Sequence, residues 1–161
     1  MPDAFAMHVD QATEADIPGW LKLAAEVEFL FGPMISDPGF HDYLRKNIAR
    51  STAFCVREDD GSPGRPLIGG LGFSSKPSLY RIGWLSVAEQ RRRNGIGQCL
   101  LEHVFGLVKP PAELVVTTFG DDIAAGRPAR QFYACMGFHA AEQAPAGPDG
   151  GSRQLFRRIF V

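Results

Sequence analysis

VAEQRRRNGIGQCLL, residues 87–101, is the stretch of sequence that decides the fold. The apolar run that leads into it, residues 82–87, predicts a largely buried strand. Apolar residues then recur at helical spacing, at Ile96, Leu100, Leu101 and Val104. The segment therefore predicts a strand, a cationic turn that contains glycine, and an amphipathic helix.

The turn between the strand and the helix is suited to an anion. Gly95 and Gly97 have no side chains to keep an anion away from the backbone. The first N–H groups of a helix have no intrahelical acceptor and lie at the positive end of the helix dipole. With Arg91, Arg92 and Arg93 beside them, these donors predict a pyrophosphate site. The alternative is that the arginines form a solvated surface, which is the common role of such a cluster.

Spacing separates three kinds of glycine-rich phosphate loop. A dinucleotide fingerprint needs G-x-G-x-x-G or G-x-G-x-x-A directly after the strand. Here its third position is Leu100, and residues 88–94 intervene. A Walker A loop needs a lysine followed by serine or threonine, and both are missing. The pattern that remains is Arg-x-x-Gly-x-Gly, at Arg92, Gly95 and Gly97.

This pattern resembles the signature of the GNAT superfamily of acetyl-CoA-dependent acyltransferases, Q/R-x-x-G-x-G/A after a central strand. Residues 128–138, PARQFYACMGF, resemble a later family segment in which an alanine and an aromatic–tyrosine pair precede Gly-Phe. Two motifs in the family's order make the resemblance specific. It implies that acetyl-CoA is the cosubstrate. The implied cofactor-binding residues are Leu85, Ser86, Val87, Arg92, Arg93, Asn94, Gly95, Ile96, Gly97 and Gln98.

The order of predicted elements extends the resemblance over nearly the whole chain. Strands are predicted at residues 5–9, 52–57, 67–75, 79–87, 113–119, 139–143 and 153–161. Helices are predicted to begin near residues 13–18, at 37–38, at 96 and at 129. We expect one α/β domain, residues 1–161, with a mixed α+β arrangement. Its sheet would be mostly antiparallel, with one parallel strand pair splayed at the cofactor site and about four flanking helices.

Tyr133, in the second motif, is the first catalytic candidate. It shares a helix face with Ala129, Phe132 and Met136, which is also typical of an ordinary packed tyrosine. The resemblance implies that Tyr133 gives a proton to the leaving thiolate. Because the ordinary pKa of tyrosine is about 10, the side chain is protonated at neutral pH and can act as an acid.

The resemblance also implies the course of the reaction. The acceptor amine attacks the thioester directly in a ternary complex, with no covalent enzyme intermediate. Catalysis then depends on positioning and on stabilising the oxyanion, for which the backbone N–H groups of residues 85–87 are available.

A base is needed because only a neutral amine can attack. Glu28 falls within an apolar helical arc formed by Ile17, Leu21, Ala24 and Phe31, so we consider it as the catalytic base. The alternative is a glutamate at the end of a helix that reaches water. Asp121, Asp122 and a water molecule are rival candidates for the same role.

One position departs from the family pattern. Many members carry an asparagine seven residues before the tyrosine, where it helps to hold the cofactor arm, and this chain has Gly126. Asp121 and Asp122 lie nearby and are candidates to compensate. The departure concerns the contact with pantetheine and leaves the pyrophosphate site intact.

Composition excludes several classes of partner. Seventeen basic and eighteen acidic residues leave the chain nearly neutral, which argues against nucleic acid or an anionic membrane. Cys55, Cys99 and Cys135 are predicted to be reduced thiols, with Cys99 and Cys135 packed in the core, and they show no metal-site spacing. We therefore expect no metal and a cytoplasmic location, because no signal peptide or membrane span is evident.

The expected function is transfer of an acetyl group from acetyl-CoA to a primary amine. The acceptor could be a small molecule or a peptide, and pairing of the C-terminal strands could form a homodimer. The alternative is a catalytically silent domain on the same fold that senses acyl-CoA or binds a partner.

Overall fold

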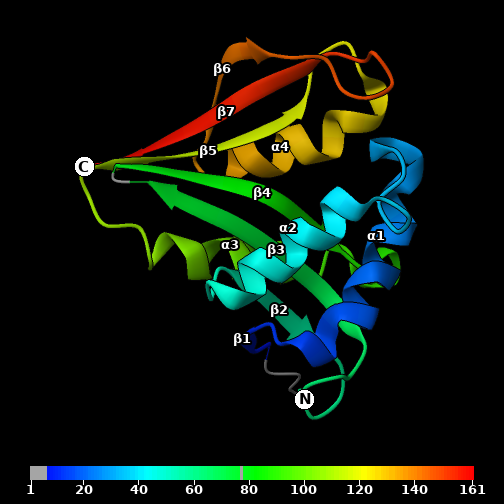
Figure 1. Cartoon of the computed structure of the whole chain (residues 1–161). Helices are drawn as coiled ribbons and strands as arrows, with labels where there is room; N and C mark the ends of the chain where they lie inside the picture. Colours follow the sequence, from blue (N-terminus) through cyan, green and yellow to red (C-terminus); the bar gives the residue numbers. More distant parts are fainter. Residues whose placement is uncertain (1–6, 77) are drawn as a thin grey trace.

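A mixed sheet of seven strands runs through the computed structural model, which describes residues 7–76 and 78–161 (Figure 1). The strands are β1 (Val9–Gln11), β2 (Ala53–Arg57), β3 (Leu67–Lys76), β4 (Leu79–Val87), β5 (Ala112–Phe119), β6 (His139–Ala144) and β7 (Arg153–Phe160). Their order in the sheet is β1-β2-β3-β4-β5-β7-β6. The helices are α1 (Ile17–Phe31), α2 (Pro38–Ala49), α3 (Ile96–Phe105) and α4 (Arg127–Cys135), and short 3₁₀ turns precede α1, α3 and α4.

The strand pairing confirms the predicted mixed sheet. Strands β1 to β4 form an antiparallel meander, and β4 pairs with β5 in parallel. The C-terminal hairpin, β6 with β7, adds antiparallel strands beyond β5. The first strand is β1 (Val9–Gln11); of the range predicted for it, residues 5 and 6 lie outside the described residues. No helix of the described chain is both long and apolar enough to cross a membrane.

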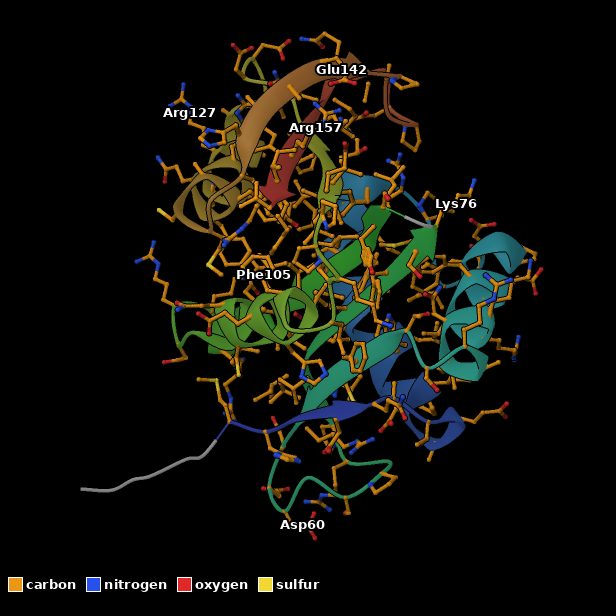
Figure 2. The ribbon with its side chains drawn as sticks, turned by 90° about the vertical axis from the view of Figure 1, so that its left-hand side faces the viewer. Asp60, Lys76, Phe105, Arg127, Glu142 and Arg157 are labelled. Atoms are coloured by element: carbon orange, nitrogen blue, oxygen red, sulfur yellow. The ribbon has the colours of Figure 1, made fainter. Side chains whose placement is uncertain are left out.

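Two helices cover each face of the sheet, with α1 and α2 on one side and α3 and α4 on the other (Figure 2). Glycines in β3 allow both layers to approach the sheet closely. A Cβ atom on Gly69 would lie 2.7 Å from Ile96 of α3, and one on Gly70 would lie 3.2 Å from Trp20 of α1. The apolar spacing of α3 is satisfied as predicted, since Ile96, Leu100, Leu101 and Val104 are all buried.

Two predictions about burial were wrong. The buried face of α1 consists of Trp20, Leu23, Ala24 and Val27. Glu28 is therefore at the margin of this face and not inside an apolar arc. Cys135 was predicted to pack in the core, but it is exposed because it ends α4 on the side away from the sheet, and Cys99 is half-buried.

Strand β4 is also less buried than its apolar sequence predicted. It pairs with β5 only over Leu79–Ile82, and a β-bulge interrupts its pairing with β3 next to Gly83. Beyond Ile82 the two parallel strands separate, so the last half of β4 has a partner on one side only. Of its nine residues, only Ile82 and Ser86 are buried. This open edge is the entrance to the site described below.

Candidate active site

A cleft of about 470 Å³ lies where β4 and β5 separate. Residues from α1, β4, the start of α3, the end of β5 and α4 line it, so both helix layers contribute to its walls. The lining includes nine of the ten predicted cofactor-binding residues: Leu85, Ser86, Val87, Arg92, Arg93, Gly95, Ile96, Gly97 and Gln98. Tyr133 lines the cleft as well. The fold thus brings the two sequence motifs together around one cavity.

The phosphate turn, residues 91–98, presents free backbone donors at this cleft. Gly95 has φ +77° and precedes α3, whose start has no side-chain cap. The Cys99 N–H donates to the Gly95 carbonyl at 3.0 Å. Because Ile96, Gly97 and Gln98 come before that bond, their N–H groups have no intrahelical acceptor. An anion is the natural partner for such donors.

Side chains of the phosphate turn support this geometry. Asn94, the predicted cofactor residue that does not line the cleft, donates from Nδ2 to the carbonyls of Arg91 and Arg92, at 3.0 and 3.4 Å. These bonds hold the turn, in which Arg93 has φ +67°. The Arg92 and Arg93 side chains are exposed and line the cleft. Two positive charges therefore flank the free donors of α3.

Gly97 is required by packing as well as by ligand approach. A Cβ atom there would lie 3.3 Å from the Phe132 ring of α4, a contact tighter than most. Phe132 contacts the Tyr133 ring in a T-shaped arrangement, with centroids 5.2 Å apart. The Phe132 ring therefore packs between the start of α3 and Tyr133.

Tyr133 is buried among apolar rings beside the cleft. Its ring is 7% exposed and packs edge-on against Phe138, with centroids 5.5 Å apart. Burial raises the pKa of Tyr133 well above its ordinary value. The hydroxyl has no hydrogen-bond partner among the described residues, and it stays protonated at any physiological pH. It is placed to donate to an atom in the cleft.

Glu28 lies outside the cleft lining and holds the loop that follows α1. Its Oε2 accepts hydrogen bonds from the backbone N–H groups of Met34, at 2.6 Å, and Ile35, at 2.9 Å. These two bonds lower the pKa of Glu28. A lowered pKa makes the carboxylate a weaker proton acceptor, so the geometry supports a role in shaping the loop rather than the role of base.

The other predicted carboxylates are also outside the lining. Asp121 is exposed, and Asp122 accepts a hydrogen bond from the Ser152 hydroxyl. Gly126, the departure from the family pattern, is buried against Phe119, and a Cβ atom on it would lie 2.2 Å from the Phe119 Cβ. No side chain fits at position 126, so an asparagine is excluded by packing.

Several lining residues were not predicted from the sequence. Val27 and Leu30 come from the C-terminal end of α1, and Phe119, which stacks on Phe31 with ring centroids 5.2 Å apart, comes from the end of β5. The apolar character of Val27, Leu30 and Phe119 looked like ordinary core packing, and only the opening between β4 and β5 makes them walls of the cleft.

The mixed sheet, with a cleft between two separating parallel strands and a cationic turn at the cleft, defines the class of fold to which the protein belongs. The sequence model described as acetyltransferase (GNAT) domain matches residues 50–140. The chain belongs to the GNAT acetyltransferase family. A comparison with curated proteins finds no match.

Solved structures share the fold. An acetyltransferase of the GNAT family from Desulfovibrio desulfuricans is 22% identical, with a TM-score of 0.72 over 96% of this chain and 99% of the other. Ard1 from Thermoplasma volcanium is 17% identical, with a TM-score of 0.76 over 97% and 99%. The PaiA N-acetyltransferase from Thermoplasma acidophilum, in complex with coenzyme A, is 14% identical, with a TM-score of 0.71 over 97% and 100%.

Proposed function

We propose that this protein transfers an acetyl group from acetyl-CoA to a primary amine, by direct attack in a ternary complex. The observation that carries the proposal is the single cleft that joins the phosphate turn, the open edge of β4 and Tyr133. These are the three parts that an acyl-CoA thioester requires: a site for its pyrophosphate, a strand edge for its amide-bearing arm and an acid for its sulfur.

The donor would bind from the α3 face. Its pyrophosphate would accept hydrogen bonds from the free N–H groups of Ile96, Gly97 and Gln98, with Arg92 and Arg93 beside it. Its pantetheine arm would pair with residues 85–87, where β4 has no partner strand on the β5 side. Coenzyme A in the Thermoplasma acidophilum structure, which shares the fold, supports this choice of ligand.

Tyr133 would protonate the sulfur as the C–S bond breaks. The amine nitrogen attacks the thioester carbon, a tetrahedral oxyanion forms, and collapse of that intermediate expels the thiolate of CoA. N–H groups at the open edge of β4 would donate to the oxyanion. The raised pKa of Tyr133 keeps its proton available until a thiolate develops beside it.

The proton of the attacking amine would leave through water. None of the described residues that line the cleft is acidic, and the carboxylate of Glu28 is engaged by the loop after α1. No carboxylate of the described cleft lining would therefore serve as the base. Water at the open mouth accepts the proton once the C–N bond has formed.

The test is release of the CoA thiol with a panel of amines, compared for wild type and Tyr133→Phe. We expect the substitution to lower kcat about 100-fold, as for loss of a general acid, with little change in the KM for acetyl-CoA. A variant with unchanged kcat would remove Tyr133 from the mechanism. Tyr80→Phe is the matched control, because the Tyr80 hydroxyl accepts a hydrogen bond from the Lys109 N–H outside the cleft lining, and its loss should leave kcat unaltered.

One observation favours a second candidate, a catalytically silent domain that senses acyl-CoA. Gly126 leaves no room for the asparagine that many family members use on the cofactor arm. A silent domain would be stabilised by acetyl-CoA and would release no thiol with any amine. The same panel therefore separates the two functions.

A further inference from the structure

The walls of the cleft come from both faces of the sheet, and the proposed function assigns the two sides to different substrates. Arg92 and Gly97 line the cleft beside α3, and Val27, Leu30 and Phe31 line it from α1, which packs on the opposite face of the sheet. A donor with its pyrophosphate at the start of α3 fills the first side. The acceptor would then reach the thioester from the second side, which we call the acceptor mouth: Val27, Leu30, Phe31 and Phe119.

The acceptor mouth is apolar and has no counter-ion for a cation. Val27 and Phe119 are buried, Leu30 is half-buried, and Phe31 is 40% exposed while it stacks on Phe119. Among the described residues of the whole cleft lining, only Arg92 and Arg93 are charged. An ammonium group that entered here would lose water without gaining a carboxylate partner from the cleft lining, which is costly. The mouth therefore selects an amine that is already neutral.

This requirement separates amines by their ordinary pKa. The α-amino group of a polypeptide has a pKa of about 7.7–8.0, and the lysine side chain has one of about 10.4. At pH 7.5 roughly a third of such α-amines are neutral, against about 0.1% of lysine amines, a difference of roughly 300-fold. Polyamines and aminoglycosides also carry further charges that an apolar mouth would have to desolvate.

We infer that the acceptor, given the proposed function, is the α-amine of a polypeptide N-terminus whose first side chain is apolar. The first side chain follows the amine into the acceptor mouth, where it contacts Leu30 and the Phe31–Phe119 pair. A free amino acid is disfavoured because its carboxylate would enter the same mouth unpaired. In a polypeptide that carboxyl is an amide, and the rest of the chain remains in solvent.

The experiment compares three peptides whose sequences are the same except at the amine or the first residue under test. The first begins with leucine and contains no lysine, the second begins with aspartate, and the third has a blocked N-terminus and one internal lysine. Release of the CoA thiol gives kcat/KM, and mass spectrometry locates the acetyl group. We expect the leucine peptide to exceed the aspartate peptide at least tenfold and the lysine peptide about 100-fold or more.

The pH profile provides a second readout. For the leucine peptide, log(kcat/KM) should rise with unit slope and level off near pH 8, where the α-amine is neutral. A profile that still rises toward pH 10 would show that a group other than the α-amine controls the reaction, and it would overturn the inference.

A pair of adjacent substitutions tests the acceptor mouth itself. Leu30→Glu places a carboxylate in the mouth, and it should lower the preference for the leucine peptide over the lysine peptide at least tenfold. Phe29→Glu is the matched control, since Phe29 is the preceding residue on α1, is 80% exposed and lies outside the lining. Thermal stabilisation by acetyl-CoA reports that each variant is folded.

The outcomes distinguish this inference from the proposed function. Equal or better use of the lysine peptide, or equal use of the leucine and aspartate peptides, overturns the inference and leaves acetyl transfer standing. A higher kcat/KM for a small polyamine than for all three peptides also overturns the inference and leaves acetyl transfer standing. If acetyl-CoA stabilises the protein but no amine is acetylated, both the inference and the proposed function are overturned. If acetyl-CoA does not stabilise the protein, the proposed donor site itself is refuted.

Discussion

Two turns of the molecule, residues 32–35 and the phosphate turn at 91–98, both present consecutive backbone N–H groups but satisfy them differently. In the first turn, Glu28 accepts from the N–H groups of Met34 and Ile35. In the second, no side chain caps the start of α3, and the flanking side chains are arginines. One turn is completed by the chain's own carboxylate, and in the other the donors at the start of α3 are left open.

The difference shows how a ligand site can be told from a structural turn. Backbone donors that are left open, with positive side chains beside them, are suited to bind an anion. The same donors with an internal carboxylate are part of the scaffold. The four predictions that follow test this distinction, from the largest expected effect to the smallest.

Removing the positive charges of the phosphate turn should have the largest effect. Arg92→Ala combined with Arg93→Ala deletes two charge-assisted contacts worth about 1.5 kcal/mol each, so the affinity for acetyl-CoA should fall about 100-fold. Titration calorimetry measures the change. Arg91→Ala, in the same turn but paired with Glu58, should change the affinity less than threefold. A loss of binding free energy in Arg91→Ala that is half the loss in the double variant would mean that only the overall charge matters.

Alanine at the glycine of each turn should separate ligand binding from stability. Gly95 has φ +77°, and Gly32 has φ +86° with ψ 178°. Each substitution should lower the free energy of unfolding by about 1–3 kcal/mol because the new side chain strains the backbone. Only Gly95→Ala should also weaken acetyl-CoA binding. A Gly32→Ala protein that is folded but binds acetyl-CoA poorly would contradict the view that the turn at residues 32–35 is structural and only the phosphate turn binds the ligand.

The Tyr43 hydroxyl extends the comparison to a buried donor that has no partner. It lies against Gly83 and Gly72, where Cβ atoms would come within 2.3 and 2.7 Å, and it makes no hydrogen bond within the described structure. Burial raises the pKa of Tyr43 to about 12. Tyr43→Phe should therefore raise the free energy of unfolding by about 1 kcal/mol, measured by denaturant titration. A less stable variant would show that the hydroxyl has a partner in solution.

The smallest effect concerns the turn closed by Glu28. Because hydrogen bonds lower the pKa of Glu28, the stability that it contributes is present above its ordinary pKa of about 4.3 and is lost as the pH falls through the lowered value. Glu28→Gln should be less stable than wild type at pH 7. The two melting temperatures should converge in strongly acidic solution, as scanning calorimetry can show. A difference that stays constant with pH would rule out the ionised carboxylate as its source.

The phosphate turn and the order of elements could be predicted from the sequence because each depends on local chemistry. Glycine spacing at Gly95 and Gly97 and the apolar periodicity of α3 are visible in consecutive residues. The parallel pairing of β4 with β5 followed from the helix between them. These features require no knowledge of distant contacts.

The acceptor side could not be predicted in the same way. Glu28 looked like an inward-facing carboxylate on a helical wheel, but its partners, Met34 and Ile35, belong to a loop whose path the wheel does not contain. The cleft walls at Leu30 and Phe119 are apolar residues like any in the core. Their role depends on where two strands stop pairing, which is a tertiary property.

The most direct test of the central claim is thermal unfolding of wild type and of the Arg92→Ala/Arg93→Ala protein with acetyl-CoA, free CoA and NAD. A ligand at about a hundred times its dissociation constant adds about 2.7 kcal/mol to the free energy of unfolding. We predict stabilisation of wild type by both CoA compounds, no effect of NAD, and a much smaller shift in the double variant. Equal stabilisation of both proteins, or none of wild type, would contradict the assignment of the phosphate turn.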